Sequence, residues 1–211
     1  MTEKIFKGDS YIKEFDATII EIDGNNIILD KTAFYANSGG QPGDVGVISE
    51  AKVIDTKYDG KKIVHIVENH NLSVGDSVHC EIDWDRRYKI MRLHSAAHIA
   101  YEFFTKKWGE QKVIGSNISE SKARLDFAMD ESVSESLVGI EKDVNEFIEK
   151  GHEITTDDDP ENKEFRWWYC GDMKMPCGGT HVKNSKEIGK IKLKRKNLGT
   201  GKERIEVTLD E

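Results

Sequence analysis

The sequence pattern changes near residue 85, within the stretch DWDRRYK at residues 83–89. Before it, short runs rich in β-branched residues are separated by glycine-containing turns, as in FDATIIEIDGNNIILD at residues 15–30. After it, residues 87–107 contain neither glycine nor proline, and Gly109 follows as a candidate C-cap. Short strands without a helical period are typical of a small β-barrel, and the uninterrupted stretch predicts one long helix. The change therefore predicts two domains, at residues 1–84 and 85–211.

The second half of the chain predicts another helix and several strands. Residues 133–150 form an amphipathic pattern that Gly151 would end. Its apolar face carries Leu137, Ile140, Val144, Phe147 and Ile148. Strands are expected at residues 121–129, 152–156, 165–170, 188–197 and 203–210. Because helices and strands are segregated rather than alternating, we expect an α+β fold, in which a small N-terminal β-barrel precedes an α+β domain with an antiparallel sheet.

The lack of a recognisable targeting signal and the cysteine usage favour a cytoplasmic protein. No apolar run approaches the ~20 residues that a transmembrane helix needs. The N-terminal stretch MTEKIFKGDSYIKEF lacks the apolar core of a signal peptide. The cysteines are Cys80, Cys170 and Cys177, and an odd number argues against a disulfide framework. We therefore expect reduced thiols and no membrane partner.

The net charge of −8 is unevenly distributed. Residues 1–84 carry 8 Lys and 15 Asp or Glu, residues 130–164 carry 3 basic and 13 acidic residues, and residues 183–204 carry 9 basic and 2 acidic residues. Phosphate affinity depends on local basic density rather than on the total charge. The basic segment therefore fits either a nucleic-acid contact or a lysine-rich edge strand, and composition alone favours the edge strand.

The stretch RLHSAAHIAYEFF, residues 92–104, places His94 and His98 four residues apart in the long predicted helix. Residues with this spacing lie on one helical face with Cβ atoms roughly 5–6 Å apart, so both imidazoles could bind one metal ion. A pair of this kind is, on its own, more often structural. The zinc-protease helix is excluded, because it needs Glu directly after the first His and this chain has Ser95 there.

A second stretch, MPCGGTHV at residues 175–182, offers a thiol and another imidazole, Cys177 and His181. Pro176 disfavours a helix before it, and the two glycines allow a tight turn. Three nitrogens and one sulfur suit tetrahedral zinc, at roughly 2.0–2.1 Å for nitrogen and 2.3 Å for sulfur. With both stretches present, one zinc ion per chain is favoured over a buried cysteine in a glycine turn. The sequence leaves a structural and a catalytic ion open, because it does not count the ligands that bind.

Three motifs in one order resemble a known family. HSAAH at residues 94–98, CGGTHV at 177–182 and FYANSGGQPGDVG at 34–46 resemble the editing domain of alanyl-tRNA synthetase and its free-standing relatives, the alanyl-tRNA editing proteins of the AlaX type. The resemblance covers nearly the whole chain and looks like the medium-length form. The threonyl-tRNA synthetase editing domain shares the histidine spacing, but its Cys–His segment differs.

The resemblance implies a trans-editing hydrolase that cleaves the ester of tRNA(Ala) mischarged with serine, with glycine as a second candidate. It implies that the zinc ligands are His94, His98, Cys177 and His181. It also implies that Gly39, Gly40 and Gln41 lie near the active site and aid serine discrimination. One position departs from the family pattern, since Val113 stands where an amide is expected. The choice between serine and glycine is therefore left open.

Three polar residues are candidates to contact the serine hydroxyl, namely Gln41, Thr180 and Ser116. A site that pairs with this hydroxyl rejects alanine, because alanine leaves buried polar groups unpaired. Each of the three could instead be a turn or cap residue. Zinc would either acidify a bound water or hold the aminoacyl end, and four ligands favour holding. Asp126 is a candidate general base only if it faces the site.

Basic residues near the first helix and in the strand at 188–197 are candidates for tRNA contacts. They are Arg86, Arg87, Arg92, Lys192, Lys194, Arg195 and Lys196. Strict alternation in KIKLK places Lys190, Lys192 and Lys194 on one strand face. A tryptophan of RWWY, residues 166–169, could stack on the terminal adenine, although a core position is favoured.

Two other functions remain open from sequence. One is a zinc-stabilised nucleic-acid-binding module without catalysis, and the other is a metal hydrolase acting on a small ester or amide. Deacylation of mischarged tRNA would distinguish them. The sequence does not choose between a monomer and a dimer.

Overall fold

The computed structural model describes residues 2–130, 132–162 and 165–211. The chain divides into two compact units, Met1–Tyr88 and Lys89–Glu211. Helix α1 (Trp84–Trp108) begins in the first unit and continues into the second. The predicted α+β class with mostly antiparallel sheets is confirmed.

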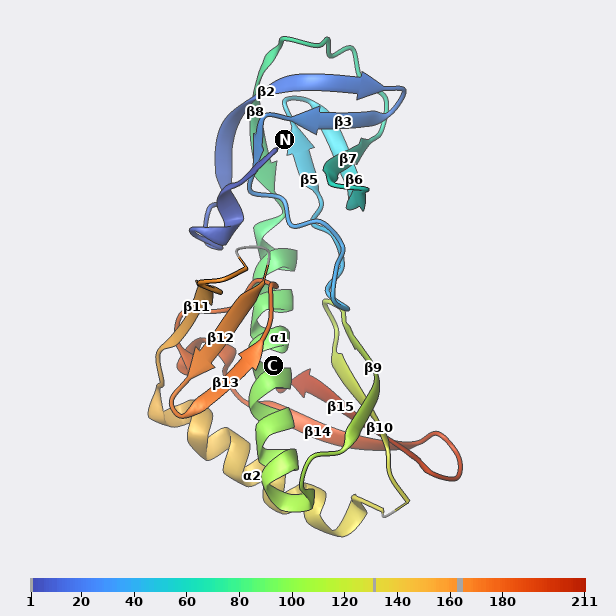
Figure 1. Cartoon of the computed structure of the whole chain (residues 1–211), viewed down its shortest axis with the longest axis vertical. Coiled ribbons are helices and arrows are strands. Elements are labelled where there is room, and N and C mark those ends of the chain that lie inside the picture. Colours follow the sequence, from blue (N-terminus) through green and yellow to red (C-terminus); the bar gives the residue numbers. More distant parts are fainter. Residues whose placement is uncertain (1, 131, 163–164) are drawn as a thin grey trace. The chain divides into compact units, whose positions relative to one another are not determined.

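The first unit is built from short strands (Figure 1). They are β1 (Glu3–Lys4), β2 (Glu14–Asp23), β3 (Asn26–Leu29), β4 (Lys31–Thr32), β5 (Gly46–Ile48), β6 (Ala51–Asp59), β7 (Lys62–Val67) and β8 (Ser77–Ile82), with a 3-10 turn η1 (Ile5–Lys7). Six strands close into a barrel in the order β2-β3-β7-β6-β5-β8, and each neighbouring pair is antiparallel. Strands β1 and β4 form a separate parallel pair.

Alternation along the barrel strands explains the core of this unit. Every second residue of β8 is buried, and β2 alternates in the same way over most of its length. Side chains from several strands meet inside, among them Phe15, Ile19, Leu29, Phe34 and Val53. A six-stranded barrel of this size is filled by side chains, which agrees with their near-complete burial.

The second unit contains two helices and two antiparallel sheets (Figure 1). Its helices are the body of α1 and α2 (Ser134–Lys150). The four-stranded sheet runs in the order β14 (Ile191–Asn197), β15 (Lys202–Leu209), β10 (Ala123–Ala128) and β9 (Lys112–Ile118). The three-stranded sheet contains β11 (Ile154–Asp158), β12 (Arg166–Cys170) and β13 (Met173–Pro176), followed by a 3-10 turn η2 (Ser185–Ile188).

Helix α1 is the element that both sheets of this unit contact. Phe104 of α1 stacks on Phe127 of β10, with 4.2 Å between the ring centroids, and the centroids of His98 and Trp168 of β12 are 4.9 Å apart. Helix α2 contacts α1 through Phe147, whose ring centroid lies 5.7 Å from that of Phe103. Packing on three sides explains why the helix buries almost all of residues 90–100 and has little amphipathic character.

The predicted helix ends are close to those observed. Gly109 directly follows the last residue of α1, and Gly151 directly follows the last residue of α2. Both glycines have positive φ, at 73° and 78°. Four of the five predicted apolar positions of α2 are buried, whereas Phe147 is half-buried. Strands β9 and β13 lie outside the predicted strands. Strand β9, KVIGSNI, shows no alternation of apolar and polar residues, and β13, MKMP, alternates over only four residues. Neither described helix has the length and hydropathy that a transmembrane segment needs.

Candidate metal centre

Helix α1 supplies two imidazoles to a buried cluster in the second unit. His94 and His98 lie one turn apart, and their ring centroids are separated by 4.7 Å. His94 is 5% exposed, whereas His98 is half-buried. Trp168 of β12 is fully buried against His98, so the sheet β11-β12-β13 forms one wall of the cluster.

The loop after β13 supplies the other two side chains. The backbone N–H of Cys177 donates to Arg166 O at 2.9 Å, which holds the start of the loop against β12. Cys177 Sγ lies 3.4 Å from His94 Nε2 and 3.5 Å from His181 Nε2. The two stretches that carry these residues are far apart in sequence, and the fold brings them together.

The geometry of the four residues fits a tetrahedral cation. Their candidate ligand atoms all lie within 4.8 Å of one another. An ion with bonds of roughly 2.0–2.1 Å to nitrogen and 2.3 Å to sulfur separates those atoms by ~3.5 Å, close to the observed contacts. His98 Nε2 is buried and has no hydrogen-bond partner among the residues that the structure describes. A lone pair in this position is available to a metal ion, and the mixed nitrogen and sulfur set suits zinc.

Burial sets the protonation of this cluster. Burial lowers the pKa of His94 and of His181 well below the usual histidine value, and it lowers the pKa of His98 to about 3. The imidazoles are therefore neutral near pH 7 and can donate electron pairs. Burial also raises the pKa of the Cys177 thiol to about 11, so a bound cation would displace its proton.

A second group of possible metal ligands lies on the barrel and is exposed. It consists of Glu14, His79 and Glu81. His79 Nδ1 lies 2.9 Å from Asp16 Oδ1, and this hydrogen bond raises the pKa of the imidazole. These contacts form a surface ion-pair network.

The Gly-rich segment of the first unit forms a tight turn. Ser38 and Gln41 exchange backbone hydrogen bonds at 3.1 and 3.0 Å, and the two glycines between them have φ of 58° and 85°. Positive φ at both central positions is the requirement of a type I′ turn, and glycine meets it without strain. Gln41 is 1% exposed. Gly39 and Gly40 therefore allow the chain to turn directly before Gln41.

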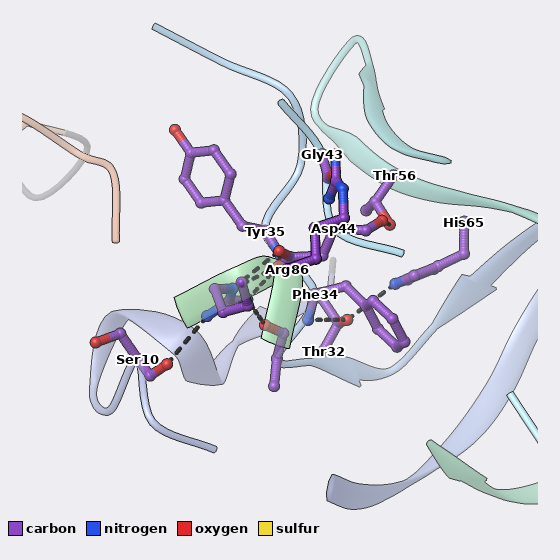
Figure 2. Close-up of polar contacts among 11 residues, drawn as sticks. Ser10, Thr32, Phe34, Tyr35, Gly43, Asp44, Thr56, His65 and Arg86 are labelled. Carbon is purple, nitrogen blue, oxygen red and sulfur yellow. Dashed lines mark hydrogen bonds and ion pairs between the residues drawn. The ribbon is translucent and has the colours of Figure 1, made fainter. Parts of the chain in front are cut away.

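A buried ion pair anchors the same segment (Figure 2). Arg87 donates to both carboxylate oxygens of Asp44, and the two side chains are 0% and 1% exposed. Asp44 also accepts from the backbone N–H of Tyr35 at 2.6 Å, and its own carbonyl accepts from the Thr56 hydroxyl at 2.9 Å. Arg86 donates to Gly43 O at 2.9 Å. The first turn of α1 and strand β6 therefore hold the segment from two sides.

One predicted tRNA contact is wrong. Arg87 has no exposed surface and its guanidinium is occupied by Asp44, Ala33 O and Ser10 O, so it cannot meet a phosphate. Sequence pattern could not reveal this, because its partner lies 43 residues away. A buried Arg needs such a partner, and Asp44 of the Gly-rich segment supplies it only in the folded chain.

The other basic candidates differ in their ion pairing and in their exposure to solvent. Arg92 donates to Ile188 O and pairs with Glu211, and Arg195 pairs with Glu203. The strand β14 alternates as predicted, because Ile191 and Leu193 are buried and the lysine that follows each of them is exposed. The exposed lysines of β14 are Lys192, Lys194 and Lys196.

The remaining candidates occupy distinct environments. Thr180 is 1% exposed and precedes His181, while Ser116 is exposed on β9. Asp126 forms a bidentate ion pair with Arg204 at 2.6 and 2.8 Å, so its carboxylate does not serve as a free base. Trp168 is a core residue as expected.

Models of known protein families match parts of both units of the chain. The family model for tRNA synthetases class II (A) matches residues 2–86, and the model for the threonyl and alanyl tRNA synthetase second additional domain matches residues 169–206. The alanyl-tRNA editing protein AlaX-M of Pyrococcus horikoshii is 38% identical over 100% of this chain and 99% of its own length. The chain belongs to the AlaX-M family of alanyl-tRNA editing proteins. The AlaX-M protein of Saccharolobus solfataricus is 35% identical over 99% of both chains.

The chain also matches part of a larger enzyme. The alanine–tRNA ligase of Ignicoccus hospitalis is 35% identical over 91% of this chain but over only 24% of its own length. The chain is thus similar, over most of its length, both to free-standing proteins and to part of a synthetase.

Proposed function

We propose that this chain is a trans-editing deacylase that hydrolyses Ser-tRNA(Ala), with Gly-tRNA(Ala) as a second substrate. The observation that carries the proposal is the convergence of His94, His98, Cys177 and His181, whose candidate ligand atoms lie within 4.8 Å of one another. Membership of a family of alanyl-tRNA editing proteins supports the substrate. Removal of a wrong amino acid from tRNA(Ala) would protect the fidelity of translation.

We assign the four residues as ligands of one zinc ion, so α1 is the zinc-binding helix. A bound zinc ion would supply Lewis acidity to the aminoacyl end of the tRNA. The neutral imidazoles add no positive charge to the site, and Trp168 and the loop that carries Cys177 line it. An activated ester needs little more than orientation and a positioned water.

Discrimination between serine and alanine would rest on polar side chains near the aminoacyl group. Thr180 directly precedes the candidate ligand His181, and Thr180 and Gln41 are each 1% exposed. A site that hydrogen-bonds the serine hydroxyl rejects alanine, because the alanine methyl group cannot form that bond. The turn at Gly39 and Gly40 would present Gln41, and Ser116 is a third candidate for this contact.

We place the tRNA contact on basic residues of strand β14 and helix α1. Lys192, Lys194 and Lys196 lie on β14, with Arg195 between two of them, and Arg92 is 17% exposed on α1. Arg86 is half-buried at the start of α1. We further propose that residues 1–84 act as a barrel domain for discrimination and residues 85–211 as the editing domain. An enzyme that acts on aminoacyl-tRNA would work in the cytoplasm.

A deacylation assay tests the proposal. Purified zinc-loaded protein is mixed with Ser-tRNA(Ala), Gly-tRNA(Ala), Ala-tRNA(Ala) and Ser-tRNA(Thr), and release of the amino acid is followed over time. We expect loss of serine from tRNA(Ala) and little loss of alanine. Persistence of Ser-tRNA(Ala) at ample enzyme would overturn the proposal. Binding of the tRNA without hydrolysis would indicate a zinc-stabilised binding module, and preference for Ser-tRNA(Thr) would indicate a threonyl-type editing domain.

A further inference from the structure

Ser95 lies between the two helical histidines, and its side chain is fully buried. Serine in a helix interior usually faces solvent or bonds to the preceding turn, and a buried hydroxyl needs a partner. Ser95 Oγ accepts a hydrogen bond from the backbone N–H of Val182 at 3.3 Å. The serine thereby joins helix α1 to the loop between β13 and η2.

This hydrogen bond joins two residues that are each next to a candidate ligand, one in helix α1 and one in the loop after β13. Ser95 directly follows His94, and Val182 directly follows His181. Val182 is 1% exposed, so its N–H cannot turn to bulk water if the serine oxygen is removed. The bond therefore ties the backbone next to His181 to the helical turn of His94, and the two imidazole centroids lie 4.3 Å apart.

Other hydrogen bonds hold the ends of this loop to different elements. At its start, the Cys177 N–H donates to Arg166 O of β12 at 2.9 Å. At its end, the Ile154 N–H of β11 donates to Lys183 O at 2.9 Å. These bonds connect the loop to the three-stranded sheet, whereas the Ser95 bond connects it to the helix that carries the other two ligands.

We propose that Ser95 is a positioning residue that sets the metal affinity of the four-ligand cluster. The inference rests on the metal-binding part of the proposed function. A tetrahedral ion needs its ligands within a fraction of an ångström of the correct distances. Because two ligands come from the helix and two from the loop, a bond between those elements preorganises the cluster before the ion binds. Loss of such an outer partner typically weakens metal binding ~10–100-fold.

The test is a zinc titration of the metal-free full chain against a chromophoric chelator. We expect Ser95→Ala to bind zinc roughly 10-fold more weakly than the wild type, with an unchanged far-ultraviolet circular dichroism spectrum. Hydrogen exchange gives a second readout, because the Val182 amide should exchange faster in Ser95→Ala while amides elsewhere in α1 keep their wild-type rates.

Ser185→Ala is the matched control. Ser185 is also fully buried, and its hydroxyl donates to Ile148 O at 3.0 Å and accepts from the His152 N–H at 2.8 Å. We expect this variant to lose stability but to keep its zinc affinity within about two-fold. Equal zinc affinity of Ser95→Ala and the wild type, or an equal loss in Ser185→Ala, would refute the positioning role alone. Failure of the wild type to bind zinc would refute the metal centre as well.

Discussion

The candidate centre owes its properties to the burial of individual side chains. Three imidazoles and one thiol lie together, and burial lowers the pKa of each imidazole and raises that of the Cys177 thiol to about 11. The imidazoles thus remain neutral, which avoids mutual repulsion among groups 4.3–5.1 Å apart. Neutral nitrogen donors and a thiol that can lose its proton are the forms in which these residues bind zinc.

Removal of a single ligand should be visible as a loss of metal. We expect His98→Ala and Cys177→Ala to lower bound zinc well below one ion per chain, because each removes one donor of the tetrahedral set. Mass-spectrometric metal analysis after dialysis measures this directly. His152→Ala serves as the control, since His152 belongs to the same unit but stacks on Phe147 outside the cluster. Unchanged zinc in both ligand variants would refute the four-ligand site.

His65 should make the stability of the barrel unit depend on pH. The residue is fully buried, and its Nδ1 donates to Ile27 O at 3.0 Å. Its Nε2 accepts from the Thr32 hydroxyl at 2.9 Å (Figure 2). Burial lowers the pKa of His65 from 6.5 to about 4, so the unfolded chain takes up this proton at a higher pH than the folded chain does. The free energy of unfolding should therefore fall on acidification, by roughly 2 kcal/mol between pH 7 and pH 5.

The variant His65→Gln isolates this contribution. Glutamine does not titrate, so the variant should be less stable than the wild type at pH 7 but should lose about 2 kcal/mol less on going to pH 5. Urea unfolding at both pH values measures the difference, and the other histidines cancel because both proteins contain them. Parallel pH profiles for the two proteins would contradict the assignment.

Among the structural elements, the Gly-rich segment depends most on close backbone approach. A Cβ atom at Gly43 would lie 2.0 Å from Thr56 O of β6, whereas a Cβ at Gly39 would meet no atom within 4 Å. Gly39 instead requires glycine through its φ of 58°. The two positions therefore need glycine for different physical reasons, although the sequence shows the same residue at both.

Alanine substitutions should separate these two reasons. Gly39→Ala should cost about 1 kcal/mol of unfolding free energy, because only a left-handed backbone conformation is strained. Gly43→Ala should cost more, at roughly 1–3 kcal/mol or above, because the segment must move away from β6. Urea unfolding gives both values. A larger loss in Gly39→Ala than in Gly43→Ala would contradict the described packing.

Over the whole molecule, the charge is unevenly distributed. The chain carries a net charge of −8, but strand β14 presents exposed lysines at alternate positions. Basic density of this local kind attracts phosphates through counterion release, independently of the total charge. Arg87 and Arg195 add little to this basic density, because their guanidinium groups are paired with Asp44 and Glu203.

The double variant Lys194→Ala with Lys196→Ala should weaken tRNA binding. The slope of log affinity against log salt should become shallower by roughly 1–2, because each lost phosphate contact contributes ~0.7–0.9. Fluorescence anisotropy with labelled tRNA(Ala) at several salt concentrations measures both quantities. Lys142→Ala with Lys150→Ala on the acidic helix α2 is the matched control and should leave the slope unchanged. An equal effect of the two double variants would contradict a specific contact on β14.

The order of motifs and the periodicity of apolar residues were enough to predict the α+β class, the helix from about residue 85, its C-cap at Gly109 and the four candidate ligands. These features are encoded locally, in spacings of a few residues along the chain. The role of Arg87, the pairing of Asp126 with Arg204 and the bond from Ser95 to Val182 required the tertiary structure. Each joins residues more than 40 positions apart, and a polar side chain takes the partner that burial leaves within reach, which no local spacing specifies.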